Sequence, residues 1–213
     1  MRIDRIHHPS ESSPHGEPPL HRMSSLTIDP TTSALVLIDL QRGIVGMPTV
    51  PHSASDVVAR AAELARRFRE CGALVVLVRV DPGPDGKLMP TPVTDVPRQM
   101  PARTPDWIQL VPELGPQAGD VVVTKHQPNA FYATDLEVHL TRRAIRTIVL
   151  GGIATNIGVE STARAAHERG YEQLFVQDAM TARDVDLHTL AVTRFFPTIG
   201  RVRSTRDVLD ALA

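Results

Sequence analysis

The chain has 213 residues, a length that suits one domain with a short additional segment. Its formal net charge of -1 provides no strong field for nucleic acid or for an anionic membrane surface. No apolar run reaches the ~18 residues of a membrane-spanning helix, so neither nucleic acid nor membrane is a predicted partner. The one cysteine, Cys71, excludes an intramolecular disulfide and fits a reducing compartment, which predicts a cytoplasmic location.

Residues 1–24 differ in composition from the rest of the chain. They hold four histidines, several prolines and serines, and no periodic apolar pattern. They also lack the apolar core of about 7–15 residues that marks a secretory signal. We therefore expect residues 1–24 to be a disordered tail and residues 25–213 to form one domain.

From Leu26 onward, the patterns of strands and helices alternate along the chain. Continuous apolar runs are typical of strands that are covered on both faces, and apolar residues at helical spacing indicate helices. The predicted strands are 34–39, 73–80, 120–125, 147–151, 173–178 and 199–203. The predicted helices are 54–71, 134–143, 156–169, 186–196 and 205–213.

This alternation predicts an α/β fold with an open, mainly parallel six-stranded sheet and helices on both faces, a Rossmann-like arrangement. Right-handed crossovers place the carboxyl ends of parallel strands at one edge of the sheet, where ligands bind. Residues 81–116 carry nine of the 18 prolines and Trp107, and we interpret them as a long loop across one end of the sheet. A loop of that length in a compact domain is usually functional.

Two opposite charges end predicted strands at this edge. Asp39 closes a run of five apolar residues, and Lys125 ends the third strand. Burial raises the pKa of a carboxyl and a nearby cation lowers it, so the two effects oppose each other at Asp39. The pair forms either a structural salt bridge or part of a catalytic site. Gln41 follows on the same side of the chain, where its amide contacts a ligand or satisfies loop backbone.

A glycine-containing turn connects the fourth strand to the next helix. The glycines at 151–152 permit a tight turn or a positive φ, and Thr155 or Asn156 is expected to cap the helix. The backbone N–H groups of residues 157–159 would then point into the site in the geometry of an oxyanion hole. Gly158 has no side chain, and glycine there either relieves close packing or leaves room for substrate or water.

Residues 26–213 resemble the isochorismatase-like hydrolases, also called the cysteine hydrolase superfamily. The segments that carry the resemblance are Leu-Ile-Asp39-Leu-Gln41, Lys125 with residues 129–136, residues 152–162, Asp178-Ala and His188. The resemblance implies the isochorismatase-like fold, an Asp–Lys–Cys triad and a non-proline cis peptide near Ile153-Ala154. Asp39 and Lys125 match the triad, whereas Gly158 stands at the position of the nucleophilic cysteine.

The resemblance also implies which residues form the site. The expected catalytic positions are Asp39, Lys125 and Gly158, the last as a vacated nucleophile position. The expected substrate-binding residues are Gln41, Phe131, Ile153, Ala154, Thr155 and Ile157. Phe131 either lines the pocket or belongs to the core.

No metal and no other cofactor are expected. The metal motif of the family's nicotinamidases, an Asp-x-His with a later histidine, is missing after Gln41, and His52 alone does not replace it. His188 is expected to hydrogen-bond backbone, and His126 to point to the strand face opposite Lys125.

A small-molecule substrate is expected, but Gly158 excludes attack by a thiol. The first hypothesis is a hydrolase without a covalent nucleophile. The resemblance to the true isochorismatases implies that Asp39 would protonate the enol carbon of a vinyl ether and that Lys125 would tune the acidity of Asp39. Water would then add to the oxocarbenium carbon, and pyruvate would be released. The alternatives are an amide or ester hydrolase in which Asp39 activates water, and an inactive family member that binds a metabolite or partner. Family members usually assemble, so a homodimer or homotetramer is expected.

Overall fold

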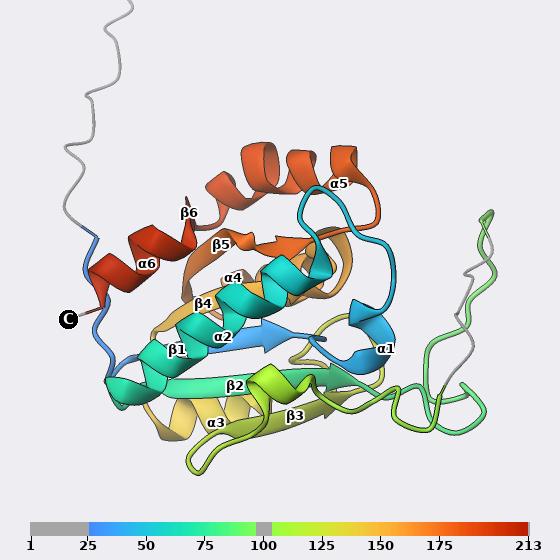
Figure 1. Cartoon of the computed structure of the whole chain (residues 1–213), viewed down its shortest axis with the longest axis horizontal. Helices are drawn as coiled ribbons and strands as arrows, with labels where there is room; N and C mark the ends of the chain where they lie inside the picture. Colours follow the sequence, from blue (N-terminus) through green and yellow to red (C-terminus); the bar gives the residue numbers. More distant parts are fainter. Residues whose placement is uncertain (1–25, 97–103, 213) are drawn as a thin grey trace, which may run out of the picture.

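The structure, a computed structural model, describes residues 26–96 and 104–212. The predicted tail at residues 1–24 lies outside the described residues. The sheet consists of β1 Ser33–Ile38, β2 Leu74–Val80, β3 Val121–Lys125, β4 Thr147–Ile153, β5 Glu172–Thr181 and β6 Arg201–Arg203. All neighbouring strands pair in parallel, in the order β3-β2-β1-β4-β5-β6. The predicted open six-stranded α/β sheet is confirmed (Figure 1).

Helices cover both faces of this sheet (Figure 1). The α-helices are α1 Arg42–Val45, α2 Ala54–Glu70, α3 Leu136–Arg142, α4 Glu160–Glu168, α5 Val185–Leu190 and α6 Thr205–Ala211. The shorter turns are the 3-10 helices η1 Pro112–Leu114 and η4 Phe196–Thr198 and the π-helices η2 Thr155–Val159 and η3 Ala191–Phe195. Within the described part of the chain, no helix combines the length and the apolar character needed to cross a membrane.

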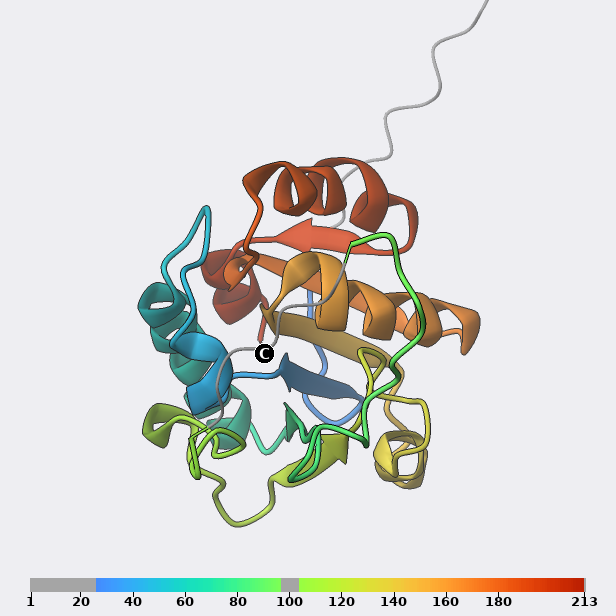
Figure 2. The same ribbon diagram turned by 90° about the vertical axis from the view of Figure 1, so that its right-hand side faces the viewer.

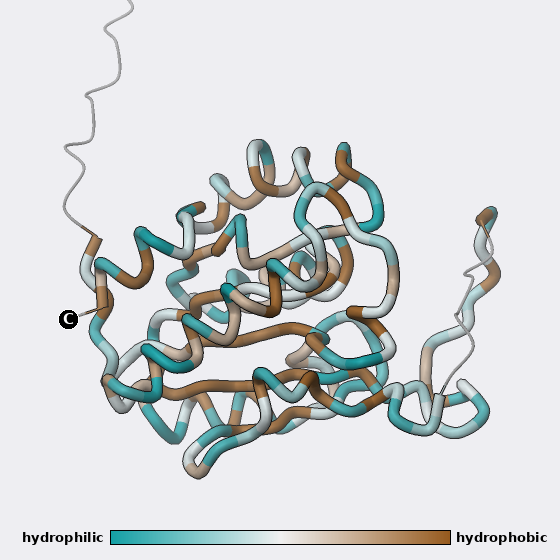
Figure 3. The backbone as a smooth tube through the Cα atoms, viewed as in Figure 1, coloured by the Kyte–Doolittle hydropathy of each residue, from teal (hydrophilic) through white to brown (hydrophobic). Residues whose placement is uncertain are grey.

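The core forms two hydrophobic layers, one on each face of the sheet. Leu64 and Phe68 of α2 pack in one layer with Val208 of α6. Leu140 of α3 and Ala163 of α4 pack in the other. β1 and β2, which lie between these layers, are almost entirely apolar, and Figure 3 shows them as continuous hydrophobic bands. Each large side chain buried in this way contributes about 1.5–3 kcal/mol to folding.

The structure corrects two predicted helices. The helix predicted at 156–169 begins as the π-helix η2, in which the Val159 N–H donates to the carbonyl five residues earlier. The helix predicted at 186–196 divides into α5, η3 and η4, with Pro197 inside the last turn. Apolar periodicity does not report such changes of helical pitch, because π and α turns place similar residues on one face.

The strand order reverses next to β1, and this places the site. The chain proceeds from β1 to β2 and β3 on one side, and to β4, β5 and β6 on the other. Ligands of open α/β sheets bind at the carboxyl ends of the strands at such a switch point. Figure 2 looks onto this edge, and Figure 1 shows the long loop after β2 extending beyond it.

Candidate active site

Asp39 directly follows β1 at the switch point. Its φ of 54° is a left-handed conformation, which aspartate tolerates better than most residues. Its N–H donates to the Val78 carbonyl at 2.8 Å, and its own carbonyl accepts from the Gln41 N–H at 2.9 Å. Both backbone groups are therefore fixed, and β1 ends here with the carboxyl at the binding edge.

Lys125, the last residue of β3, reaches across β2 to this carboxyl. Its Nζ donates to Asp39 Oδ2 at 2.9 Å and to the Pro128 carbonyl at 2.8 Å. The lysine is only 1% exposed. The structure thus brings together the two charges that the sequence placed at separate strand ends.

Burial determines the proton affinity of Asp39. Burial raises the pKa of Asp39, and the attraction of Lys125 opposes this rise without cancelling it. In addition, Asp39 Oδ1 is buried and has no hydrogen-bond partner among the described residues. An unpaired buried oxygen is better tolerated on a neutral carboxyl than on a carboxylate. Of the two opposing effects at Asp39, burial is therefore the larger, and this carboxyl stays protonated to a higher pH than an exposed one.

Gly158 lies directly beside this pair. A Cβ at Gly158 would be 3.1 Å from Asp39 Oδ2 and 3.3 Å from Lys125 Nζ. It would also be 2.8 Å from Ile38 Cγ2, so this side chain would have to move. Gly158 lines the cavity described below. Glycine therefore relieves close packing against Ile38. That it also leaves room for substrate or water stays a prediction.

The turn from β4 into η2 contains a cis peptide between Ile153 and Ala154. The helix begins after Ala154, with no side-chain cap, so the predicted cap at Thr155 or Asn156 is wrong. The Ala154 carbonyl accepts from the N–H groups of residues 157 and 159, at 3.1 and 3.2 Å. These two donors are satisfied within the turn, which contradicts their expected role as an oxyanion hole.

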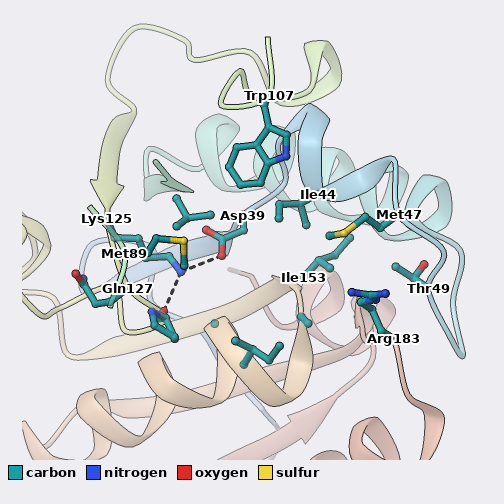
Figure 4. Close-up of a pocket in the computed structure, with 15 residues that line it drawn as sticks. Asp39, Ile44, Met47, Thr49, Met89, Trp107, Lys125, Gln127, Ile153 and Arg183 are labelled. Carbon is teal, nitrogen blue, oxygen red and sulfur yellow. Dashed lines mark hydrogen bonds and ion pairs between the residues drawn. The ribbon is translucent and has the colours of Figure 1, made fainter. Parts of the chain in front are cut away.

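A cavity of about 170 Å³ opens beside the pair (Figure 4). It is lined by Asp39, Ile44, Met47, Thr49, Val80, Met89, Trp107, Lys125, Gln127, Pro128, Ile153, Ala154, Ile157, Gly158 and Arg183. The volume is small beside the ~300–1,000 Å³ typical of pockets for drug-sized ligands. The lining includes all three positions expected to be catalytic, together with Ile153, Ala154 and Ile157.

Gln41 and Phe131, two residues expected to bind substrate, do not line the cavity. The Gln41 side chain is fully buried, where Oε1 accepts from the Val80 N–H at 2.8 Å. Its Nε2 donates to the carbonyls of Val80 and Trp107 at 3.0 and 3.2 Å. Of the two roles expected for Gln41, the structure therefore shows hydrogen bonds to backbone groups rather than contact with a ligand. Phe131 is 4% exposed and packs in the core beside Tyr171.

Thr155 also lies outside the cavity lining, because its side chain turns away to a buried histidine. Thr155 Oγ1 is 2.8 Å from Nδ1 of His188, so the histidine contacts a side chain rather than the expected backbone group. Burial and the neighbouring His52 lower the pKa of His188 to about 4. His126 Nδ1 contacts the Asp81 carbonyl at 2.6 Å and does not line the cavity. In residues 26–96 and 104–212, no cluster of three or more potential metal ligands occurs.

Sequence reasoning missed the residues that loops bring to the cavity. Trp107 is 3% exposed, and a Cβ on Gly43 of α1 would collide with its indole. A single tryptophan in a proline-rich loop was the available signal for this contact. Met89 comes from the same loop, and Arg183 follows the end of β5. For these two, spacing carries no signal, since loop conformation alone places them.

Several known proteins are similar to this chain in sequence. It matches the model of the isochorismatase domain over residues 33–207. It is 44% identical over 188 residues to the uncharacterized isochorismatase family protein YecD of Escherichia coli O157:H7. The aligned region covers 88% of this chain and 100% of that protein. The chain is 30% identical to maleamate amidohydrolase of Pseudomonas putida, over 84% of this chain and 86% of the relative.

A solved isochorismatase family protein from Burkholderia thailandensis has the same fold. The two chains are 50% identical and superpose with a TM-score of 0.83. The aligned region covers 88% of this chain and 98% of the other. The region matched by the domain model includes both charges of the buried pair and the glycine beside them. This protein therefore belongs to the isochorismatase family.

Proposed function

We propose that this protein is a hydrolase of a small metabolite that works without a covalent nucleophile, with Asp39 as general acid and base and Lys125 as its partner. One observation carries the proposal: the buried carboxyl of Asp39 lines the cavity with a raised pKa, and Gly158 places no side chain beside it. A carboxyl whose pKa is raised toward the working pH is suited to give a proton and take it back.

A vinyl ether such as isochorismate is the substrate that this carboxyl fits best. The neutral Asp39 transfers its proton to the terminal enol carbon, and the double bond supplies the electron pair of the new C–H bond. Water adds to the resulting oxocarbenium carbon, and one of its protons restores Asp39. The other proton moves to the ether oxygen, which leaves as an alcohol while pyruvate is released. Lys125 Nζ, at 2.9 Å, stabilises the carboxylate between the two proton transfers.

A second reaction is favoured by the similarity to maleamate amidohydrolase. By its name, that relative hydrolyses an amide. In this chain water would have to attack the amide, because Gly158 supplies no nucleophile, and Asp39 would act as the base. This reaction needs the ionised carboxylate, so it would run best at a higher pH than vinyl ether hydrolysis.

The test measures pyruvate release from isochorismate and ammonia release from a panel of small amides. Asp39→Asn keeps the size of the side chain and tolerates the φ of 54° at this position. Loss of the acid is expected to lower turnover at least ~100-fold. Asp210→Asn, an exposed carboxylate paired with Arg206, is the matched control and should keep full activity.

The outcomes separate the possible functions. Pyruvate release by the wild type and the control, but not by Asp39→Asn, supports the vinyl ether reaction. Ammonia release with the same dependence supports the amide reaction. Turnover retained in a folded Asp39→Asn variant would reject Asp39 as the acid or base. Ligand binding without any product would make the protein a metabolite-binding member of the family.

A further inference from the structure

A second cavity lies at the edge of the sheet opposite the candidate active site. It has a volume of about 200 Å³ and is lined by Arg69, Gly72, Ala73, Leu74, Ala118, Gly119, Asp120 and Arg143. Helix α2 ends at this edge, and β2 and β3 begin there with Leu74 and Val121. Because β3 ends at Lys125, this cavity and the candidate active site lie at opposite ends of the same strand.

The acid of this lining already has a cationic partner. Asp120 accepts from Nε of Arg69 at 3.1 Å and from Nη2 of the same side chain at 2.7 Å. The side chain of Asp120 is 3% exposed, and the Gln117 N–H also donates to it, at 2.9 Å. Glu70, which follows Arg69 on the chain, is paired with Arg66 at 2.6 Å. Both carboxylates are therefore neutralised by arginines other than Arg143.

Arg143 brings a second positive charge to the cavity. It follows the last residue of α3 and is exposed. Its Nη1 donates to the His139 carbonyl at 3.3 Å, and it forms no ion pair with any described residue. Glu137 of α3 is paired with Arg169 at 3.0 Å, and no acid follows Arg143 on the chain before Glu160. Since arginine stays protonated, the lining carries an excess of one positive charge.

The helix ends at this edge leave no open acceptors that would favour a cation instead. The carboxyl end of a helix carries a partial negative charge, because its last carbonyls lack partners within the helix. Here the N–H groups of residues 71–73 donate to carbonyls of α2, and those of residues 143–145 donate to carbonyls of α3. By contrast, the N–H groups of Ala118 and Gly119 in the lining have no hydrogen-bond acceptor among the described residues. The groups that remain open to a ligand are therefore donors.

We propose that this cavity binds a phosphate group, free or carried by a small molecule, between the guanidinium groups of Arg69 and Arg143. The two bonds to Asp120 hold the Arg69 side chain in place and leave its Nη1 without a partner among the described residues. Guanidinium groups bind oxyanions through paired N–H donors. One guanidinium satisfies the two oxygens of a carboxylate, whereas a phosphate group has oxygens for both arginines. The site is independent of the proposed hydrolase function, because none of its residues lines the cavity beside Asp39.

The experiment measures binding to the full chain. Inorganic phosphate, glycerol 3-phosphate and acetate are titrated by calorimetry at constant ionic strength, because salt screens exposed charges. The proteins are wild type, Arg143→Gln and the matched control Arg142→Gln, which removes the adjacent exposed arginine outside the lining. Arg183→Gln, in the cavity beside Asp39, reports whether the anion binds there instead. Circular dichroism verifies that each variant is folded.

Wild type is expected to bind one phosphate group per chain and to bind acetate more weakly. Arg143→Gln should weaken phosphate binding by about 10- to 100-fold, because a charge-assisted contact is lost. Arg142→Gln and Arg183→Gln should match wild type. Tighter binding of glycerol 3-phosphate would support a phosphorylated small molecule as the ligand, and equal or tighter binding of inorganic phosphate would support the free ion.

Other results would overturn the phosphate site. An equal loss of affinity in Arg142→Gln would indicate general attraction by the positive surface, and a loss in Arg183→Gln alone would place the anion beside Asp39. Tighter binding of acetate than of phosphate, or no saturable phosphate binding by folded wild type, would also reject it. Hydrolysis does not enter these measurements, so this proposal and the hydrolase function stand or fall separately.

Discussion

The ion pair between Asp39 and Lys125 is unusual among the contacts of individual residues because both groups are buried. Removing two charges from water costs several kcal/mol each, so such a pair adds little net stability. The surface pairs, such as Arg66 with Glu70, carry no comparable penalty because water still reaches them. A buried pair at a cavity wall, with a shifted pKa on one partner, is better explained by function than by stability.

The rate of vinyl ether hydrolysis should fall as the pH rises through the pKa of Asp39. That pKa is raised in the folded protein, so the neutral acid persists to higher pH than in an exposed aspartate. The same shift means that protonated Asp39 favours the fold, and this contribution is lost as pH rises through the folded pKa. Replacing Lys125 with methionine removes the attraction that lowers the pKa, so the falling limb should move to higher pH.

A profile of kcat against pH checks this expectation in folded Lys125→Met. The exposed Lys87→Met serves as the control and should reproduce the wild-type profile. A limb that does not move in Lys125→Met would show that another group gives the proton.

Gly158→Ala is expected to destabilise the fold by about 1–2 kcal/mol. Alanine would gain about 1 kcal/mol in helix propensity, but its Cβ would be 2.8 Å from Ile38 Cγ2 and force that side chain to move. Urea unfolding measures the change, and Gly46→Ala is the control because its nearest neighbour would lie at 3.4 Å. The cost should shrink in an Ile38→Ala background, and strictly additive effects of the two substitutions would contradict the contact.

At the scale of elements, the connection from β4 into η2 determines how closely the site is assembled. Gly152 pairs with Ile38 across the two central strands and has a φ of 123°. A Cβ there would collide with the Ile38 backbone, so only glycine allows β4 to approach β1 at this point. This approach brings the start of η2 over the end of β1, where Asp39 lies.

Gly152→Ala should therefore abolish folding or destabilise it by more than about 4 kcal/mol. Gly170→Ala is the matched control: Gly170 also has a positive φ, of 79°, but no atom lies within 4 Å of its added Cβ. The control should lose only about 1 kcal/mol, the cost of a left-handed alanine. Soluble yield and urea unfolding compare the two, and similar losses would show that collision with Ile38 is unimportant.

Helix α5 holds η2 through the contact of His188 with Thr155, and this contact should depend on pH. The pKa of His188 is lowered to about 4, below the ~6.5 of an unfolded histidine. Neutral His188 therefore contributes its full stability above about pH 6.5, and that contribution is lost as pH falls toward 4.

Urea unfolding between pH 4.5 and 7 should reveal this loss. The free energy of unfolding should fall with decreasing pH more steeply in wild type than in His188→Gln, by up to about 1.4 kcal/mol per pH unit. His167→Gln, an exposed residue of α4, is the control and should keep the wild-type slope. Equal slopes in all three proteins would mean that folding does not lower the pKa of His188.

At the scale of the whole molecule, apolar side chains remain exposed on elements beside the cavity. Ile157 of η2 and Leu187 and Leu190 of α5 are 43–56% exposed, and these two elements contact each other. Contiguous exposed apolar groups often mark contacts between proteins. They are consistent with the homodimer or homotetramer predicted for this chain.

Light scattering is expected to give a mass of two or four times the 23.3 kDa of one chain. Leu190→Arg should lower the fraction of assembled protein, because a charge would be buried at the contact. Val93→Arg, a fully exposed position of the long loop, is the control and should leave assembly unchanged. A monomeric wild type would reject the prediction.

Much of the fold could be predicted because parallel strands buried on both faces are continuous apolar runs. The six predicted strands all appear, although β6 (Arg201–Arg203) holds two arginines and is partly exposed. Their parallel order places Asp39 and Lys125 at one edge. The positions of the helices were also predictable, but the π-helical pitch of η2 was not. That pitch depends on the Ala154 carbonyl at the end of β4, which accepts from the N–H groups of residues 157 and 159.

The order of residues along the chain was enough to predict the sheet, the edge at which ligands are expected, the two opposite charges there and the lack of a side chain at Gly158. It was not enough to predict that Gln41 and Phe131 lie outside the cavity lining and that Arg183 belongs to it, which the folded structure shows. The folded structure also shows that burial outweighs Lys125 in setting the pKa of Asp39. Periodicity is a local property that records which face of an element is covered. Side-chain direction beyond a strand end, and the dielectric around a charge, depend on segments distant in sequence that meet only in the folded chain.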